Sequence, residues 1–213
     1  FCQFSKIDLN LDGEEDLFVF DKSGKNGTKN GNKIIPFLFN PNNNTYAYAP
    51  EYIQFFPEIR DWVLLVDYNQ DGKADIFTSD NSSISVYINN SDDELSFTFL
   101  KTLTSDAGFG PTNIYVSGTD VPAIVDVDGD TDIDILTFDP AGTYLHFHEN
   151  KSIQMYGTSD SINLVRSDDC WGRFKEDFST NSVTLNLNED CGEISGDDGR
   201  IGHSGSTILA LDL

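Results

Sequence analysis

Residues 67–75 read Asp-Tyr-Asn-Gln-Asp-Gly-Lys-Ala-Asp, and this acidic segment recurs with small changes at residues 8–16 and 126–134. All three copies fit the pattern D-x-[DN]-x-D-[GT]-x-x-D. The copies begin at Asp8, Asp67 and Asp126, so the two steps along the chain are equal. A step of this size, about 59 residues, is typical of a repeat protein built from one supersecondary unit.

Each acidic segment has an apolar run on either side, and a turn and a further alternating run follow. The paired runs lie at residues 3–7 and 17–21, 62–66 and 76–80, and 121–125 and 135–139. Their content of Phe, Ile, Leu, Val and Thr favours strands. Short strands that recur every ~40 to 60 residues are typical of a β-propeller, whereas a β-sandwich module needs about 100 residues. We therefore predict an all-β fold made of β-propeller blades.

The spacing also predicts where the repeats begin and end. We expect repeats at about residues 1–60, 61–119 and 120–206, with an insertion at about 151–199 in the third, and the start of a fourth repeat at 207–213. A closed propeller needs at least about four blades. The chain is therefore expected to be a partial propeller, with three blades and the start of a fourth, and a fragment of a larger protein.

The charge of the chain excludes two classes of partner. The 213 residues include 36 Asp and Glu against 13 Lys and Arg, which gives a net charge of −23. Such a charge repels the phosphates of nucleic acids and the headgroups of anionic lipids. No run approaches the ~18 apolar residues of a membrane-spanning helix. We expect neither nucleic-acid binding nor membrane insertion.

The acidic segments have the ligand spacing of a site for a hard cation. Side-chain oxygens at positions 1, 3, 5 and 9 and a carbonyl at position 7 suit Ca²⁺, which takes about six to eight oxygen ligands. The loops contain no Cys or His, which argues against zinc and copper. The expected ligands are Asp8, Asn10, Asp12, the Glu14 carbonyl and Asp16; Asp67, Asn69, Asp71, the Lys73 carbonyl and Asp75; and Asp126, Asp128, Asp130, the Asp132 carbonyl and Asp134. Asp212 would open a fourth, truncated site.

Two other interpretations of the loops compete with this one. An EF-hand requires Glu at position 12, where this chain has Val19, Thr78 or Thr137, and a strand follows instead of a helix. The loops could also be polar turns between strands, since Asp, Asn and Gly favour turns. Three copies at one spacing favour cation sites. Thr131 stands where the first two loops have Gly, and we expect it to strain the third site.

The loops with their flanking strands resemble the FG-GAP/VCBS repeats of integrin-like β-propellers. Phe109-Gly110 followed by Val121-Pro122-Ala123 is a loose form of the motif that names the family. Segments such as 61–64, 170–174 and 203–207 resemble a bacterial subgroup of large secreted or surface proteins. The resemblance implies calcium binding between blade strands, a location outside the cell, and export by the type-nine secretion machinery.

Residues outside the loops give weaker signals. Cys170 and Cys191 both lie in the predicted insertion, and in a secreted protein we expect them to form a disulfide, with Cys2 left over. His146 and His148 have no acidic or cysteine neighbours at metal-ligand spacing, so we expect them to face solvent. The aromatic residues of the insertion are expected to pack it onto the blade, and the alternative is that they stack on sugars or dock a protein.

These observations predict a calcium-stabilised propeller with a non-catalytic role in adhesion, in binding a protein or glycan ligand, or as a structural spacer. The alternatives are the propeller of a polysaccharide-active lyase or hydrolase, or type-nine cargo of unrelated function. No G-x-S-x-G segment surrounds a serine. No pair of carboxylates stands out as a glycosidase pair.

Overall fold

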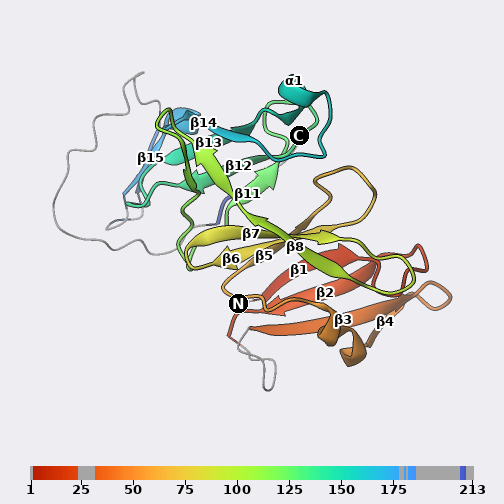
Figure 1. The fold of residues 1–213 in the computed structure, drawn as a ribbon. Coiled ribbons are helices and arrows are strands. Elements are labelled where there is room, and N and C mark those ends of the chain that lie inside the picture. The colour runs from red at the N-terminus through yellow and green to blue at the C-terminus, as the bar shows by residue number, and fades with distance from the viewer. Residues whose placement is uncertain (1, 24–31, 178–179, 181, 186–206, 210–213) are drawn as a thin grey trace. The chain divides into compact units, whose positions relative to one another are not determined.

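The computed structural model describes residues 2–23, 32–177, 180, 182–185 and 207–209. Strands make up most of the regular structure in these residues, which confirms the predicted all-β class (Figure 1). The chain divides into two compact units, Phe1–Leu103 and Thr104–Leu213. Among the described residues, no helix combines the length and the apolar character that a membrane span requires.

The first unit contains two four-stranded antiparallel sheets, and the strands of each follow one another in chain order. The strands are β1 (Cys2–Ile7), β2 (Asp16–Asp21), β3 (Lys33–Asn40) and β4 (Thr45–Tyr48) in one sheet, and β5 (Val63–Val66), β6 (Asp75–Asp80), β7 (Ser83–Asn89) and β8 (Phe97–Thr102) in the other. A 3₁₀-helix, η1 (Pro50–Phe55), follows β4. In both sheets an acidic loop joins the first strand to the second.

The two sheets of the first unit share one hydrophobic core. Phe18, Phe20 and Ile34 of the first sheet lie in the same buried cluster as Val63 and Ile76 of the second. The amide of Gln3 links strands β1 and β5, because its Nε2 donates to the Val63 carbonyl and its Oε1 accepts the Val63 N–H, each at 3.1 Å. Alternation along the strands explains the arrangement, because every second side chain points into this core.

The opposite face of the first sheet is also apolar, but it is open to solvent. Phe4 is 68% exposed and Tyr48 is 53% exposed. On the same face, the ring centroids of Phe37 and Tyr48 are 5.8 Å apart and those of Phe39 and Tyr46 are 5.1 Å apart. Aromatic side chains of this size bury large areas when a partner covers them. This face therefore has the composition of a packing surface.

The second unit contains a six-stranded sheet in the order β10-β9-β14-β13-β12-β11. Its strands are β9 (Thr104–Asp106), β10 (Pro111–Asn113), β11 (Ala123–Val125), β12 (Asp134–Phe138), β13 (Leu145–Asn150) and β14 (Leu164–Asp168). All neighbours are antiparallel except β14 and β9, which are parallel. The third acidic loop joins β11 to β12. Strands β9 and β10 lie within the second predicted repeat but pair in this third sheet. Strand β14 lies within the predicted insertion and completes the set of four strands that begins with β11.

The rest of the predicted insertion is irregular where the structure describes it. It contains the short helices α1 (Ser152–Tyr156) and η2 (Trp171–Arg173) and a two-stranded sheet of β15 (Lys175–Asp177) and β16 (Ser182–Thr184). Trp171 packs on the buried cluster of Ala123, Leu136 and Phe147, as expected for an aromatic residue that joins the insertion to the blade. Thr207, where the fourth repeat is predicted to start, forms a parallel bridge with Val121.

Candidate metal centre

The three acidic loops close in the same way. The carboxylate at position 1 accepts the backbone N–H of position 6, which brings the ends of the loop together. These distances are 2.8 Å from Gly13 to Asp8, 2.9 Å from Gly72 to Asp67 and 2.9 Å from Thr131 to Asp126. The side chains at positions 3 and 5 also accept N–H groups two residues further on. These hydrogen bonds close each loop, and the remaining oxygen lone pairs are available to a cation.

The third loop brings its carboxylates closest together. One carboxylate oxygen from each of Asp126, Asp128 and Asp130 lies within 4.8 Å of the other two. Burial and then the charge of Asp130 raise the pKa of Asp128. Like charges at this separation repel, so a cation between them would stabilise the loop. The first two loops have Asn10 and Asn69 at position 3, so they have one carboxylate fewer among the side chains at positions 1, 3, 5 and 9.

The aspartates at position 9 (Asp16, Asp75 and Asp134) occupy a different environment from the other predicted ligands. Each is the first residue of the strand that follows its loop, the second strand of the repeat, and is at most 1% exposed. One carboxylate oxygen accepts the N–H of loop position 2, and the other accepts an N–H of the third strand. The donors are Leu9 and Phe39 at 2.9 and 2.7 Å, Tyr68 and Asn89 at 3.3 and 2.8 Å, and Val127 and Asn150 at 2.9 and 2.8 Å.

The position-9 aspartates therefore fasten each loop to the body of its sheet. Burial raises the pKa of all three, to about 6 for Asp75 and Asp134, although the backbone hydrogen bonds act in the opposite direction. Each oxygen that accepts one N–H keeps a second lone pair. A position-9 aspartate can thus hold the loop and still contribute an oxygen to a cation.

Position 7 separates the third loop from the other two. The side chains of Glu14 and Lys73 are exposed, and Lys73 donates to the Ser91 carbonyl. Asp132 is instead fully buried, and its Oδ2 accepts the Ile153 N–H at 3.0 Å. Its Oδ1 has no hydrogen-bond partner among the described residues. Burial is the main cause that raises the pKa of Asp132, to about 6. The negative charges of Asp130 and Asp128 also raise this pKa, whereas the hydrogen bond from the Ile153 N–H lowers it.

The loops share an unusual backbone. Positions 4 and 6 have positive φ in all three, with Leu11, Gln70 and Gly129 at position 4 and Gly13, Gly72 and Thr131 at position 6. The third loop thus has its glycine at position 4 and a β-branched residue at position 6, where φ is +80°. A β-branched side chain is strained in this region. The expectation that Thr131 strains the third loop agrees with this conformation.

Sequence reasoning missed two residues that support the site. Asn89 and Asn150, at the ends of β7 and β13, donate their N–H groups to Asp75 and Asp134. The side-chain Oδ1 of each then accepts the hydroxyl of a serine two residues later, at 2.6 Å in both cases. The sequence signal for these residues is an N-x-S segment that begins at the last residue of the third strand. This segment occurs in the second and third repeats but not in the first.

Other predicted residues have different outcomes. Cys170 is disulfide-bonded and Cys2 is a free, exposed thiol. The predicted partner Cys191 and the predicted fourth-site ligand Asp212 lie outside the described residues, so both remain predictions.

The expectation that His146 and His148 face solvent was wrong. His148 is 5% exposed and the side chain of His146 is 14% exposed, because the strands and hairpin around them enclose a pocket.

The family comparison agrees with the loop geometry. A model of the FG-GAP-like repeat matches residues 67–137, which is about a third of the chain and includes the second and third acidic loops. The match supports an FG-GAP repeat protein. No curated protein and no solved structure matches the chain.

The two roles of the loop aspartates can be separated by substitution. In EDTA, Asp75→Asn should lower the free energy of unfolding by about 1–3 kcal/mol, because the amide can accept only one of the two buried N–H groups. Asp71→Asn is the matched control, since Asn can still accept the Lys73 N–H in an exposed loop. It should change stability little in EDTA and lose stabilisation only when Ca²⁺ is added. Urea unfolding in both conditions measures this, and equal effects of the two variants in EDTA would contradict the assignment.

The backbone at position 6 predicts a reciprocal pair of variants. Gly72→Thr should destabilise the second loop by about 1–2 kcal/mol, because it places a β-branched residue at φ +84°. Thr131→Gly should raise the free energy of unfolding by a similar or smaller amount. Both are measured by urea unfolding in EDTA, where cation affinity plays no part. If Gly72→Thr is neutral, backbone strain at this position is not the cause.

The raised pKa values predict how metal-free stability depends on pH. Asp75 and Asp134 keep their protons to about pH 6 in the folded state, whereas in the unfolded chain they ionise near pH 4. The folded state therefore binds more protons between these values, and stability from these groups falls as pH rises through this window. Urea unfolding in EDTA across this range should show the decline, and the Asp75→Asn variant should show less of it. An unchanged slope in that variant would rule out Asp75 as a source.

Proposed function

We propose that the chain forms part of a calcium-stabilised β-propeller of a secreted or cell-surface protein, with a non-catalytic role in adhesion or ligand binding. The observation that carries the proposal is the third acidic loop. There, Asp126, Asp128 and Asp130 bring their carboxylates together, and Asp132, the second residue after Asp130, has a buried Oδ1 without a partner among the described residues. A buried carboxylate oxygen without a donor is costly unless a cation or a hydrogen-bond donor satisfies it.

The donor set fits calcium better than other cations. All candidate ligands are oxygens from carboxylates, amides and backbone carbonyls, which excludes the softer metals that prefer sulfur and imidazole. The three loops differ at positions 3, 4 and 7, and Ca²⁺ tolerates such variation in geometry, whereas Mg²⁺ demands a near-ideal octahedron. Asp132 would supply its carboxylate as well as its carbonyl in the third loop. The first two loops would rely on an amide at position 3.

A propeller explains the open apolar face of the first sheet. Phe4 and Leu17 occupy the positions that Val63 and Ile76 hold one repeat later. In the second sheet, Val63 and Ile76 are fully buried in the core shared with the first sheet. By the same packing, the exposed face of the first sheet would be covered by a further blade. Blades stacked in this way form the propellers that FG-GAP-like repeats suggest.

A location outside the cell agrees with the type of cation site. Calcium sites of extracellular modules have dissociation constants of about 10⁻⁴–10⁻³ M, so they fill at the millimolar calcium levels found there. Such sites stabilise a fold and do not report small changes in calcium. The cation would then serve the same purpose as the position-9 aspartates, which is to hold the loops rigid between strands.

The test is thermal unfolding in Ca²⁺, in excess Mg²⁺ and in EDTA. At ~2 mM Ca²⁺ and a dissociation constant of ~10⁻⁴ M, each filled site adds about 2 kcal/mol to the free energy of unfolding. We expect a large rise in melting temperature with Ca²⁺ and little with Mg²⁺. The control is a triple variant, Asp12→Asn, Asp71→Asn and Asp130→Asn, which should fold in EDTA and lose the response. No response in the unaltered chain would mean that the loops are polar turns.

A further inference from the structure

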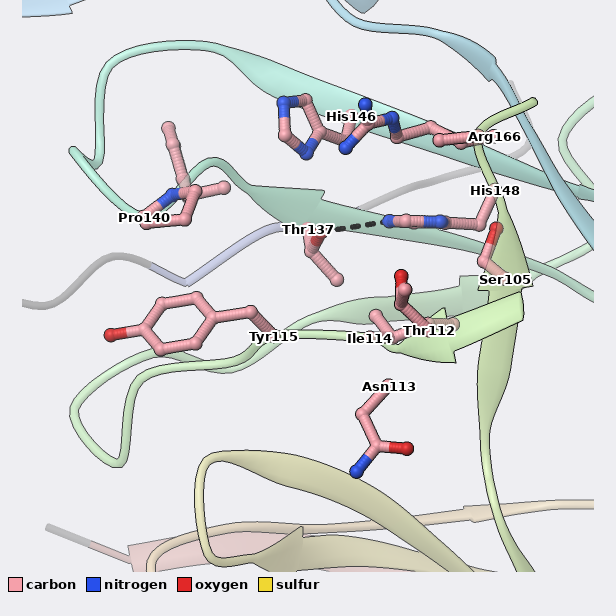
Figure 2. Close-up of a pocket in the computed structure, with 12 residues that line it drawn as sticks. Ser105, Thr112, Asn113, Ile114, Tyr115, Thr137, Pro140, His146, His148 and Arg166 are labelled. Atoms are coloured by element: carbon pink, nitrogen blue, oxygen red, sulfur yellow. Dashed lines mark hydrogen bonds between the residues drawn. The ribbon is translucent and has the colours of Figure 1, made fainter. Parts of the chain in front are cut away.

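The second unit contains a pocket that is separate from the acidic loops. It has a volume of about 80 Å³ and lies between the β9–β10 hairpin with the segment after it and strands β12, β13 and β14 (Figure 2). Register places Thr137 opposite His146, and His148 opposite Arg166. These four side chains therefore share one face of the sheet, and Ser105 lines the pocket from β9, the strand next to β14.

Two residues that line this pocket each have a buried polar atom without a partner in the described part of the chain. Ser105 is 4% exposed and His148 is 5% exposed. Neither Ser105 Oγ nor His148 Nδ1 has a hydrogen-bond partner among the described residues. The other ring nitrogen of His148, Nε2, is 3.2 Å from Thr137 Oγ1 (dashed line in Figure 2). A buried polar group without a partner is costly. These two atoms are therefore candidate donors to a group bound in the pocket.

The residues that line the pocket differ in charge from the rest of the chain. None of the twelve described residues that line it is acidic, although the chain has 36 acidic and 13 basic residues. Arg166 lines the pocket and is held by an ion pair of its Nε with Asp169 Oδ1 at 2.7 Å. Asp169 also lies 4.0 Å from His146 Nε2 and partly offsets the positive charge. The lining itself presents hydroxyl, imidazole and guanidinium groups.

A metal cation does not fit this lining. Burial, and then neighbouring positive charge, lower the pKa of His146 and bring that of His148 to about 3, so both rings are neutral at pH 7. Two neutral imidazoles could bind a metal, but the Arg166 guanidinium beside them repels one. Among the described residues, no third Cys, His, Asp or Glu joins the two histidines to form a ligand group.

We propose that this pocket binds a small oxyanion, the carboxylate group of an acidic ligand. The Ser105 hydroxyl donates to one oxygen. The Thr137 hydroxyl donates to His148 Nε2, which leaves the proton on Nδ1 and lets Nδ1–H donate to the ligand. Arg166 supplies the positive charge. The volume admits a carboxylate but not a whole sugar ring, so a larger ligand would enter by its acid group. The inference does not depend on calcium in the loops.

The test follows the imidazole signals by NMR in the presence of Ca²⁺, with sodium acetate as the probe and sodium chloride at equal ionic strength as the control. The chain has three histidines, so few signals need assignment. We expect saturable shifts of His146 and His148 with acetate and no shift with chloride or with neutral glucose. A glucuronate oligosaccharide that binds more tightly than acetate would assign the acid group to a polysaccharide. Equal affinity would assign it to a free small acid.

Variants provide the second readout. Arg166→Gln and Ser105→Ala should each weaken acetate binding about tenfold, which corresponds to ~1.4 kcal/mol. The matched control is Arg60→Gln, which removes an arginine that forms a similar ion pair, with Glu58 in the first unit, and should leave acetate binding unchanged. Acetate shifts that do not saturate, that chloride reproduces, or that survive Arg166→Gln would overturn the proposal and leave a cavity filled by water. Because calcium stabilisation is measured separately by melting temperature, the two proposals can fail independently.

Discussion

The hydrogen bonds of the position-9 aspartates are the interactions on which each repeat depends. One carboxylate joins three chain segments, because it opens the second strand, accepts an N–H from the loop before it and accepts another from the third strand. In the second repeat, the third-strand donor Asn89 lies well beyond Asp75 in the chain, so the contact links parts of the sheet that are not neighbours in sequence. An asparagine at this position can accept only one of the two N–H groups, because its amide nitrogen is a donor. The acid is thus retained in a buried position despite its desolvation, and the loop geometry follows from it.

The sequence predicts the repeating elements well, because the signal is periodic and local. The equal spacing of the acidic segments and the runs on either side of them locate the two strands that flank each acidic loop. Pairing between distant strands was not predictable. Strands β9 and β14 pair in parallel, although the whole third acidic loop and strands β10 to β13 lie between them in the chain. Strand β9 is also too short to show the alternation of apolar and polar residues that indicates a strand. The burial of His146 and His148 depends on this pairing, which is why sequence reasoning placed them in solvent.

Within the loops, the sequence identified the candidate ligands but not which of them also fasten the loop to the sheet. The pattern treats positions 1, 3, 5 and 9 alike, since all offer carboxylate or amide oxygens. Burial separates them, because position 9 opens a buried strand while positions 3 and 5 are more exposed in the first two loops. The role of Asp132 likewise depends on contact with Ile153, in the helix α1 that follows the third strand of the third repeat. One repeat can therefore gain a candidate ligand without any change in the pattern.

The distribution of acidic residues connects the two candidate sites. Repulsion among clustered carboxylates makes each loop dependent on its hydrogen bonds and favours a cation beside them. The described lining of the pocket in the second unit has no acidic residue and presents an arginine and two neutral imidazoles instead. The chain has a net charge of −23, so its long-range electrostatic field repels an anion that approaches the pocket. Short-range hydrogen bonds must therefore supply the affinity. Calcium bound in the loops would weaken that field. Calcium would thus favour oxyanion binding without contacting the ligand, and the same field would limit the pocket to ligands of low charge.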